Sequence, residues 1–118
     1  MSVTRRAMLE GALLSAAAVS CGAARALSMP PAALVVYDSR LPQSLFLRSR
    51  HSSVAVDVAA EHANYWRTLR ALMPNGRVVG LTSWSDLVLV RGFLEEKRLR
   101  LRTEVRCGDS FYWEMTGT

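Results

Sequence analysis

Short runs of apolar residues alternate with amphipathic stretches along most of the chain. Three valine-containing runs predict strands, at residues 32–37, 53–57 and 77–81, and the first and third are expected to be buried in the sheet. Between them, Pro42 suits the first turn of a short helix that reaches about residue 48. A longer helix is predicted over residues 59–73, where an apolar face recurs at spacings of four, three and four, at His62, Trp66, Leu69 and Met73.

The last third of the chain predicts one more helix and then two strands. Ser83 is placed to cap a helix with a buried stripe at Leu87, Val90 and Leu94. Residues 98–106 alternate polar and apolar side chains with a period of two, which predicts a strand with one solvated face. The aromatic stretch 111–115 follows a turn at residues 107–110, so the two strands are expected to pair as a hairpin.

Strands and helices in this order, three strand–helix pairs followed by two strands, are typical of an α/β protein. We expect a small three-layer sandwich with a mainly parallel sheet of about four or five strands and a C-terminal antiparallel hairpin. Residues 27–118 are expected to form this single small domain.

The N-terminal segment has the pattern of an export signal. Two charges, Arg5 and Arg6, precede an apolar run over residues 11–21, which is too short to span a hydrocarbon core of ~30 Å. The letters TRRAML at residues 4–9 resemble the bacterial twin-arginine (Tat) export consensus, and Ala24-Arg25-Ala26 resembles a peptidase site. This resemblance implies a signal peptide at residues 1–26, cleavage after Ala26, and a periplasmic protein.

Two other interpretations of the same segment stay open. The first is a buried N-terminal helix, but the run has no polar face to turn to solvent and is followed by Pro30 and Pro31. The second is a lipoprotein signal, in which an acylated Cys21 anchors the chain to a membrane, but Ala18 stands where leucine is usual.

Removal of the signal changes the charge and the cysteine count. The whole chain carries a net charge of +5, whereas residues 27–118 keep 12 basic and 9 acidic residues, a net charge of +3. This lower charge and the expected compartment weaken a nucleic-acid interpretation, and we predict no nucleic-acid partner. Cys107 is then the one cysteine left, so it is either buried and inert or pairs with another chain.

Polar side chains gather where the predicted strands end, which is where α/β folds bind ligands. Arg40 offers a planar fork for a carboxylate or phosphate, and the helix N-terminus at Ser83 favours anions. The sequence therefore predicts a site for an anionic small molecule, unless these residues only form turns, a cap and packing contacts. Its candidate residues are Asp38, Ser39, Arg40, Thr82, Ser83 and Trp84.

Signs of catalysis are weaker. Glycine-rich nucleotide motifs and a nucleophile elbow are missing from the sequence, and His51 and His62 lack companions at metal-ligand spacing. A trio of Ser83, His62 and Asp38 can be assembled, as in any chain of this size. We predict no metal and no cofactor, and favour a protein that is not an enzyme.

The basic strand is a second candidate surface. Its period of two places Arg98, Arg100 and Arg102 on one face, which suits an acidic partner or anionic headgroups. Each charge alone equally protects an edge strand from aggregation. We predict that these three arginines and Trp113 together form a partner surface.

Two functions follow from these residues. The twin-arginine resemblance implies a route often used by folded redox enzymes and their companion subunits. The first function is a non-enzymatic accessory or subunit of a larger exported complex, which rests on the small size, the lack of catalytic motifs and the basic, aromatic C-terminal hairpin. The second is a binding module for an anionic small molecule, or a minor enzyme, with its site at the strand ends. We expect no integral membrane segment in the mature chain.

The mature N-terminus tests the export interpretation. Mass spectrometry of the protein recovered from its native host is expected to show a chain that begins at Leu27. Acylated Cys21 would support the lipoprotein alternative instead, and an intact Met1 would refute both.

Overall fold

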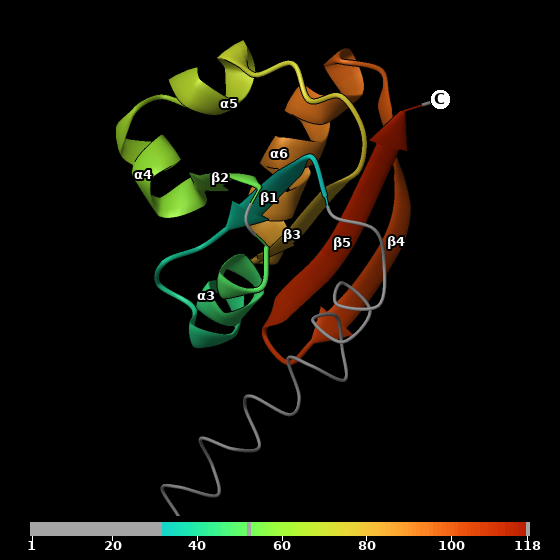
Figure 1. Ribbon diagram of the computed structural model, residues 1–118. Coiled ribbons are helices and arrows are strands. Elements are labelled where there is room, and N and C mark those ends of the chain that lie inside the picture. The colour runs from blue at the N-terminus through green and yellow to red at the C-terminus, as the bar shows by residue number, and fades with distance from the viewer. Residues whose placement is uncertain (1–31, 52, 118) are drawn as a thin grey trace, which may run out of the picture.

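A computed structural model describes residues 32–51 and 53–117, so the predicted signal with Arg5, Arg6, Cys21 and Ala26 lies outside the described residues. The protein is a mixed α/β fold (Figure 1). None of the helices in residues 32–51 and 53–117 has the length and apolar character needed to cross a bilayer. The elements are β1 (Leu34–Tyr37), α3 (Pro42–Ser49), β2 (Val54–Asp57), α4 (Val58–Ala63), α5 (Arg67–Ala71), β3 (Val78–Thr82), α6 (Trp84–Glu96), β4 (Leu99–Cys107) and β5 (Ser110–Gly117).

The five strands form one sheet in the order β2-β1-β3-β5-β4. The expected C-terminal hairpin is confirmed, because β4 and β5 pair antiparallel across a turn at Gly108 and Asp109. The expectation of a mainly parallel sheet was wrong. β1 pairs in parallel with β2 and β3, whereas β5 pairs antiparallel with both β3 and β4. The two-residue turn requires β4 and β5 to be antiparallel. Because β5, and not β4, lies next to β3, the contact between the hairpin and the rest of the sheet is antiparallel as well.

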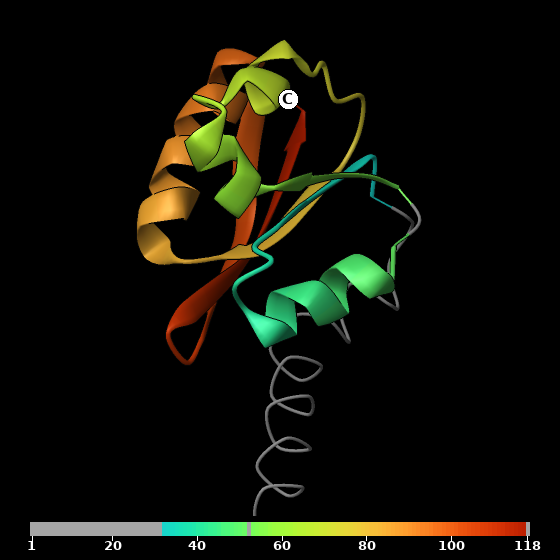
Figure 2. The same cartoon turned by 90° about the vertical axis from the view of Figure 1, so that its left-hand side faces the viewer.

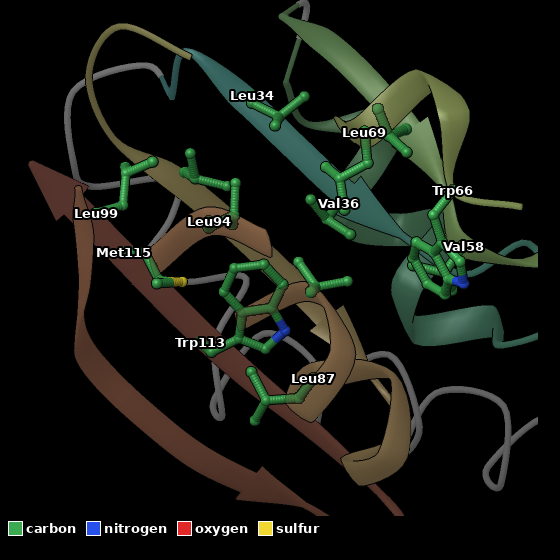
Figure 3. Close-up of a cluster of buried hydrophobic side chains, with 13 residues drawn as sticks. Leu34, Val36, Val58, Trp66, Leu69, Leu87, Leu94, Leu99, Trp113 and Met115 are labelled. Atoms are coloured by element: carbon green, nitrogen blue, oxygen red, sulfur yellow. The ribbon is translucent and has the colours of Figure 1, made fainter. Parts of the chain in front are cut away.

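Helices lie on both faces of the sheet, with α6 on one side and α3 on the other (Figure 2). On the first side α4, α5 and α6 bury the larger cluster, which includes Leu69, Leu87, Leu94 and Trp113 (Figure 3). On the second side Leu47 of α3 packs with side chains from β1, β3 and β5. α3 has eight residues and packs against β1 and β3. The full three-layer sandwich stays a prediction.

The single helix predicted over residues 59–73 is two short helices, α4 and α5. Tyr65 and Trp66 between them have φ of 52° and 60°, in the left-handed region. The carboxylate of Glu61 is buried and accepts a hydrogen bond from the N–H of Leu69 at 2.6 Å, which satisfies a backbone donor near the start of α5. Met73 lies beyond α5 and is 78% exposed, so it does not extend the apolar face.

The alternation predicted for residues 98–106 is interrupted. The register of β4 against β5 shifts between Leu101 and Thr103, so Arg102 is an extra residue in a β-bulge. Before the bulge, Leu99 and Leu101 pack with the α6 cluster; after it, Val105 packs with the α3 cluster. The extra residue moves every later side chain of β4 to the opposite face of the sheet, and the hydrophobic pattern alone does not reveal this.

The central strand β3 carries a glycine, Gly80, next to the largest of the fully buried side chains, that of Trp113. Gly80 pairs directly with Trp113 of β5, and a Cβ at position 80 would overlap the indole ring. Trp113 is fully buried, and its indole N–H donates to Thr82 Oγ1 at 3.2 Å. The absence of a side chain at Gly80 therefore makes room for the centre of the core.

Gly80→Ala is expected to lower the free energy of unfolding by about 1–3 kcal/mol, because the new methyl group overpacks the indole of Trp113. Gly92→Ala is the matched control, since nothing surrounds that position on α6. It is expected to raise the same quantity by about 0.5–1 kcal/mol. Urea unfolding measures both, and equal changes in the two variants would contradict this packing account.

Candidate functional site

The loop after β1 places a carboxylate and a guanidinium together at the carboxyl ends of the parallel strands. Asp38 is buried, and its backbone N–H donates to Ser44 Oγ of α3 at 2.7 Å. Arg40 binds this carboxylate with two nitrogens: Nε donates to Oδ1 at 2.8 Å and Nη2 donates to Oδ2 at 2.9 Å. The bidentate geometry fixes the plane of the guanidinium.

A second buried carboxylate, Asp86 in the first turn of α6, joins this pair to a histidine. Its Oδ2 accepts from Nη2 of Arg40 at 3.2 Å, and its Oδ1 lies 2.6 Å from Nε2 of His62 in α4. The Asp86 side chain is 4% exposed, whereas those of Arg40 and His62 are 56% and 43% exposed. One buried carboxylate therefore holds two partly exposed groups side by side.

The charges of this cluster shift two pKa values. Burial by itself raises the pKa of Asp38, but the hydrogen bonds and charge of Arg40 outweigh burial and hold that pKa below its ordinary 3.8. The pKa of Arg40 is raised, chiefly by its hydrogen bonds to Asp38 and against a smaller opposing effect of burial. Asp38 and Arg40 therefore remain an ion pair well into the acid range.

The cluster lines a surface pocket of about 360 Å³. Polar side chains from three segments contribute to it, the loop after β1, α4 and the start of α6, and Leu41 and Leu89 supply apolar contacts. Ser83 lines the pocket and also caps α6 as predicted, since its Oγ accepts from the N–H of Asp86 at 3.3 Å. The remaining lining residues are Asp38, Arg40, His62, Ser85 and Asp86.

Three of the six strand-end candidates do not line this pocket. The N–H of Ser39 donates to Asp57 Oδ1 at 3.0 Å, so this residue is part of the turn. Thr82 is buried, and its hydroxyl accepts from Trp113 and donates to the carbonyl of Ser83. Trp84 is half exposed and packs on Phe111 with the ring centroids 5.3 Å apart.

The predicted partner surface also needs correction. Trp113 is wholly enclosed in the core, so it cannot contact a partner. Arg98, Arg100 and Arg102 are all exposed, as predicted. They do not form a regular ladder, because Arg98 precedes β4 and Arg102 is the bulge residue, whose Nε donates to Thr116 Oγ1 at 2.9 Å.

The other polar groups singled out from the sequence lie outside the pocket. His51 is buried; burial lowers its pKa, and the charge of Arg77 lowers it further. Cys107 is buried at the end of β4. Within the described residues, no group of three or more His, Cys, Asp or Glu side chains is arranged to hold a metal ion.

Asp86 is the residue of this site that sequence reasoning missed. Its position three residues after Ser83 fits a capping box, which gave a local reason for an acidic residue there. His62 was placed beside Trp66, and their rings do make an edge contact at 4.9 Å. The hydrogen bond between His62 and Asp86 joins residues 24 apart, which local spacing does not reveal.

Comparisons of the chain with models of known protein families, with curated proteins and with solved structures found no match.

Asp38→Asn tests the electrostatics of the site. Because the folded-state pKa of Asp38 is lowered, its ionisation stabilises the fold above pH 3.8 and this contribution is lost as the pH falls through the folded-state value. The wild-type protein is therefore expected to lose more stability than Asp38→Asn between about pH 5 and pH 2, as measured by urea unfolding. The exposed Asp109→Asn is the control, and its acid slope is expected to match that of the wild type.

Proposed function

We propose that this chain is an exported, periplasmic binding protein for a small anionic molecule, held in the pocket formed by Arg40, His62 and Asp86. The observation that carries the proposal is the shared carboxylate of Asp86, which orients a guanidinium and an imidazole on one pocket wall. A site whose donors are already fixed loses little side-chain entropy when a ligand binds.

The unused atoms of this pair define the ligand contacts. Nε and Nη2 of Arg40 and Nε2 of His62 already bind carboxylates. Within the described residues, the remaining side-chain nitrogens, Nη1 of Arg40 and Nδ1 of His62, make no hydrogen bond. Nη1 is a donor to an anionic oxygen. When His62 is neutral and donates from Nε2 to Asp86, Nδ1 is an acceptor for a hydroxyl or amine of the ligand.

The charge of the site narrows the ligand class. Two carboxylates, Asp38 and Asp86, face one guanidinium, so the cluster carries one excess negative charge when His62 is neutral. Attraction of an anion then depends on directed hydrogen bonds and not on net charge. This favours a small monocarboxylate with a hydroxyl or amino group over a phosphate with two charges.

The pocket also suits a small ligand by its size and lining. Its volume of about 360 Å³ lies near the lower end of the range for small-molecule sites. The hydroxyls of Ser83 and Ser85 lie beside each other, with their oxygens 3.4 Å apart, and both residues line the pocket. They supply further donors at the N-terminus of α6, where a negative charge is favoured.

Catalysis is the weaker use of the same residues. A histidine held by a buried carboxylate is the arrangement of a general base. Among the described residues, however, no side chain except Asp86 hydrogen-bonds the ring of His62. Ser83 and Ser85 line the same pocket but make no hydrogen bond to this ring, so the hydrogen bonds of the site favour binding over catalysis.

An accessory or subunit of a larger exported complex is the second candidate function. A different observation favours it, the exposed arginines Arg98, Arg100 and Arg102 at the start of the edge strand β4. Export by the twin-arginine route is compatible with either role.

Thermal unfolding against a panel of small carboxylates and phosphate esters tests the binding function. A monocarboxylate at about a hundred times its Kd is expected to raise the free energy of unfolding by about 2.7 kcal/mol. Arg40→Ala is expected to abolish this increase, measured against its own ligand-free protein. Arg91→Ala, which removes an exposed arginine of α6 outside the pocket, is expected to retain it. Failure of every compound to stabilise the wild type, or equal responses of both variants, would refute the proposal.

A further inference from the structure

A second hollow, of about 570 Å³, lies between the C-terminal half of α6 and the start of β4. Three arginines line it, together with the single carboxylate of Glu95 and two leucines. Glu95 already pairs with Arg91, with Oε1 3.1 Å from Nε. Among the described residues, Arg98 and Arg100 make no ion pair, so their charges are not balanced within this part of the chain.

The hollow adjoins an open sheet edge. β4 is the last strand in the sheet order, and of the described strands it pairs only with β5. Its other edge therefore presents backbone N–H and C=O groups that another extended chain can bind. The edge begins at Leu99, between Arg98 and Arg100.

The backbone at Arg98 lies in a conformation that is unfavourable for a residue with a side chain. Arg98 follows the end of α6 with a φ of 66°, in the left-handed region where helices commonly carry glycine. A residue with a Cβ is strained in that region. Part of that cost is offset because a cation is favourable at a helix C-terminus, but glycine would avoid the strain altogether.

We infer that this edge binds an extended acidic segment of a partner protein, which adds to the sheet beside β4 and places its carboxylates against Arg98 and Arg100. The inference gives the accessory function its partner chemistry and rests on that function, not on the ligand pocket. Arginine binds carboxylates through two parallel hydrogen bonds, so each acidic side chain gains direction as well as charge.

An extended peptide fits this edge better than a membrane surface or a nucleic acid. Side chains on one face of a strand recur about every 6.5–7 Å, a repeat that a paired peptide shares. Glu95 and Glu104 stand among the arginines and repel a uniformly charged polyanion, while a peptide can place neutral residues opposite them. The same arginines repel the corresponding edge of a second copy of this chain.

Fluorescence anisotropy with a labelled peptide of alternating glutamate and valine tests the inference. Two peptides serve as controls, one with the same composition in separate glutamate and valine blocks and one with lysine in place of glutamate. Single-stranded DNA and vesicles of phosphatidylglycerol are the alternative anions. The wild-type protein is expected to bind the alternating acidic peptide in preference to all four.

Two variants make the test specific. Arg100→Glu and Arg98→Gly are each expected to weaken peptide binding by at least about tenfold. Arg98→Gly is also expected to keep or raise the thermal midpoint, because it relieves the left-handed backbone, so its loss of binding will not reflect unfolding. Arg67→Ala, an exposed arginine on α5, and Arg40→Ala are expected to bind as the wild type does.

Each other result overturns the inference. Equal binding of the block peptide would show that strand addition is not involved. Preference for DNA or vesicles would show a general polyanion surface, and equal weakening by Arg67→Ala would show that charge acts without position. A protein that co-purifies from periplasmic extract and is unaffected by Arg100→Glu would leave the accessory role standing but refute this surface.

Discussion

The carboxylate of Asp86 lies almost fully buried at the first turn of α6, and a buried charge is tolerated only when it is paired. Arg40 supplies one partner from the loop after β1, and His62 supplies the other from α4. Three segments far apart in the sequence therefore meet at one side chain. The walls of the pocket converge on this carboxylate, and Asp38 fixes Arg40 further by binding its Nε and Nη2.

The position of His62 depends in turn on a break in the helical chain. Glu61, the preceding residue, bends inward to accept the N–H of Leu69, and the left-handed residues Tyr65 and Trp66 separate α4 from α5. α6 then places two chemically different sites at its two ends. Its N-terminus borders the pocket, and its C-terminal half borders the basic hollow beside β4. With 13 residues the helix is about 20 Å long, so a ligand at one end does not touch the other.

The sequence was sufficient for the elements with strong local signals. The three valine-rich strands, the Ser83 cap and the C-terminal hairpin all lie close to where the hydrophobic pattern predicts them. What it did not reveal depends on contacts between distant residues. The antiparallel insertion of β5 beside β3, the bulge at Arg102 and the burial of Trp113 are decided by the packing of the whole sheet. Of the residues that the sequence singled out as a ligand site, Asp38, Arg40 and Ser83 line one pocket, whereas Asp86 and His62 join it through long-range pairing.

The ring nitrogens of His62 give the most direct test of the account, through nitrogen-15 NMR of the protein at a pH where the ring is neutral. We predict that Nε2 carries the proton, that Asp86→Asn disturbs this preference, and that a bound monocarboxylate with a hydroxyl or amino group shifts the Nδ1 resonance. A ring protonated at Nδ1 in the wild-type protein, or an Nδ1 signal unmoved by a carboxylate that stabilises the fold, would contradict it.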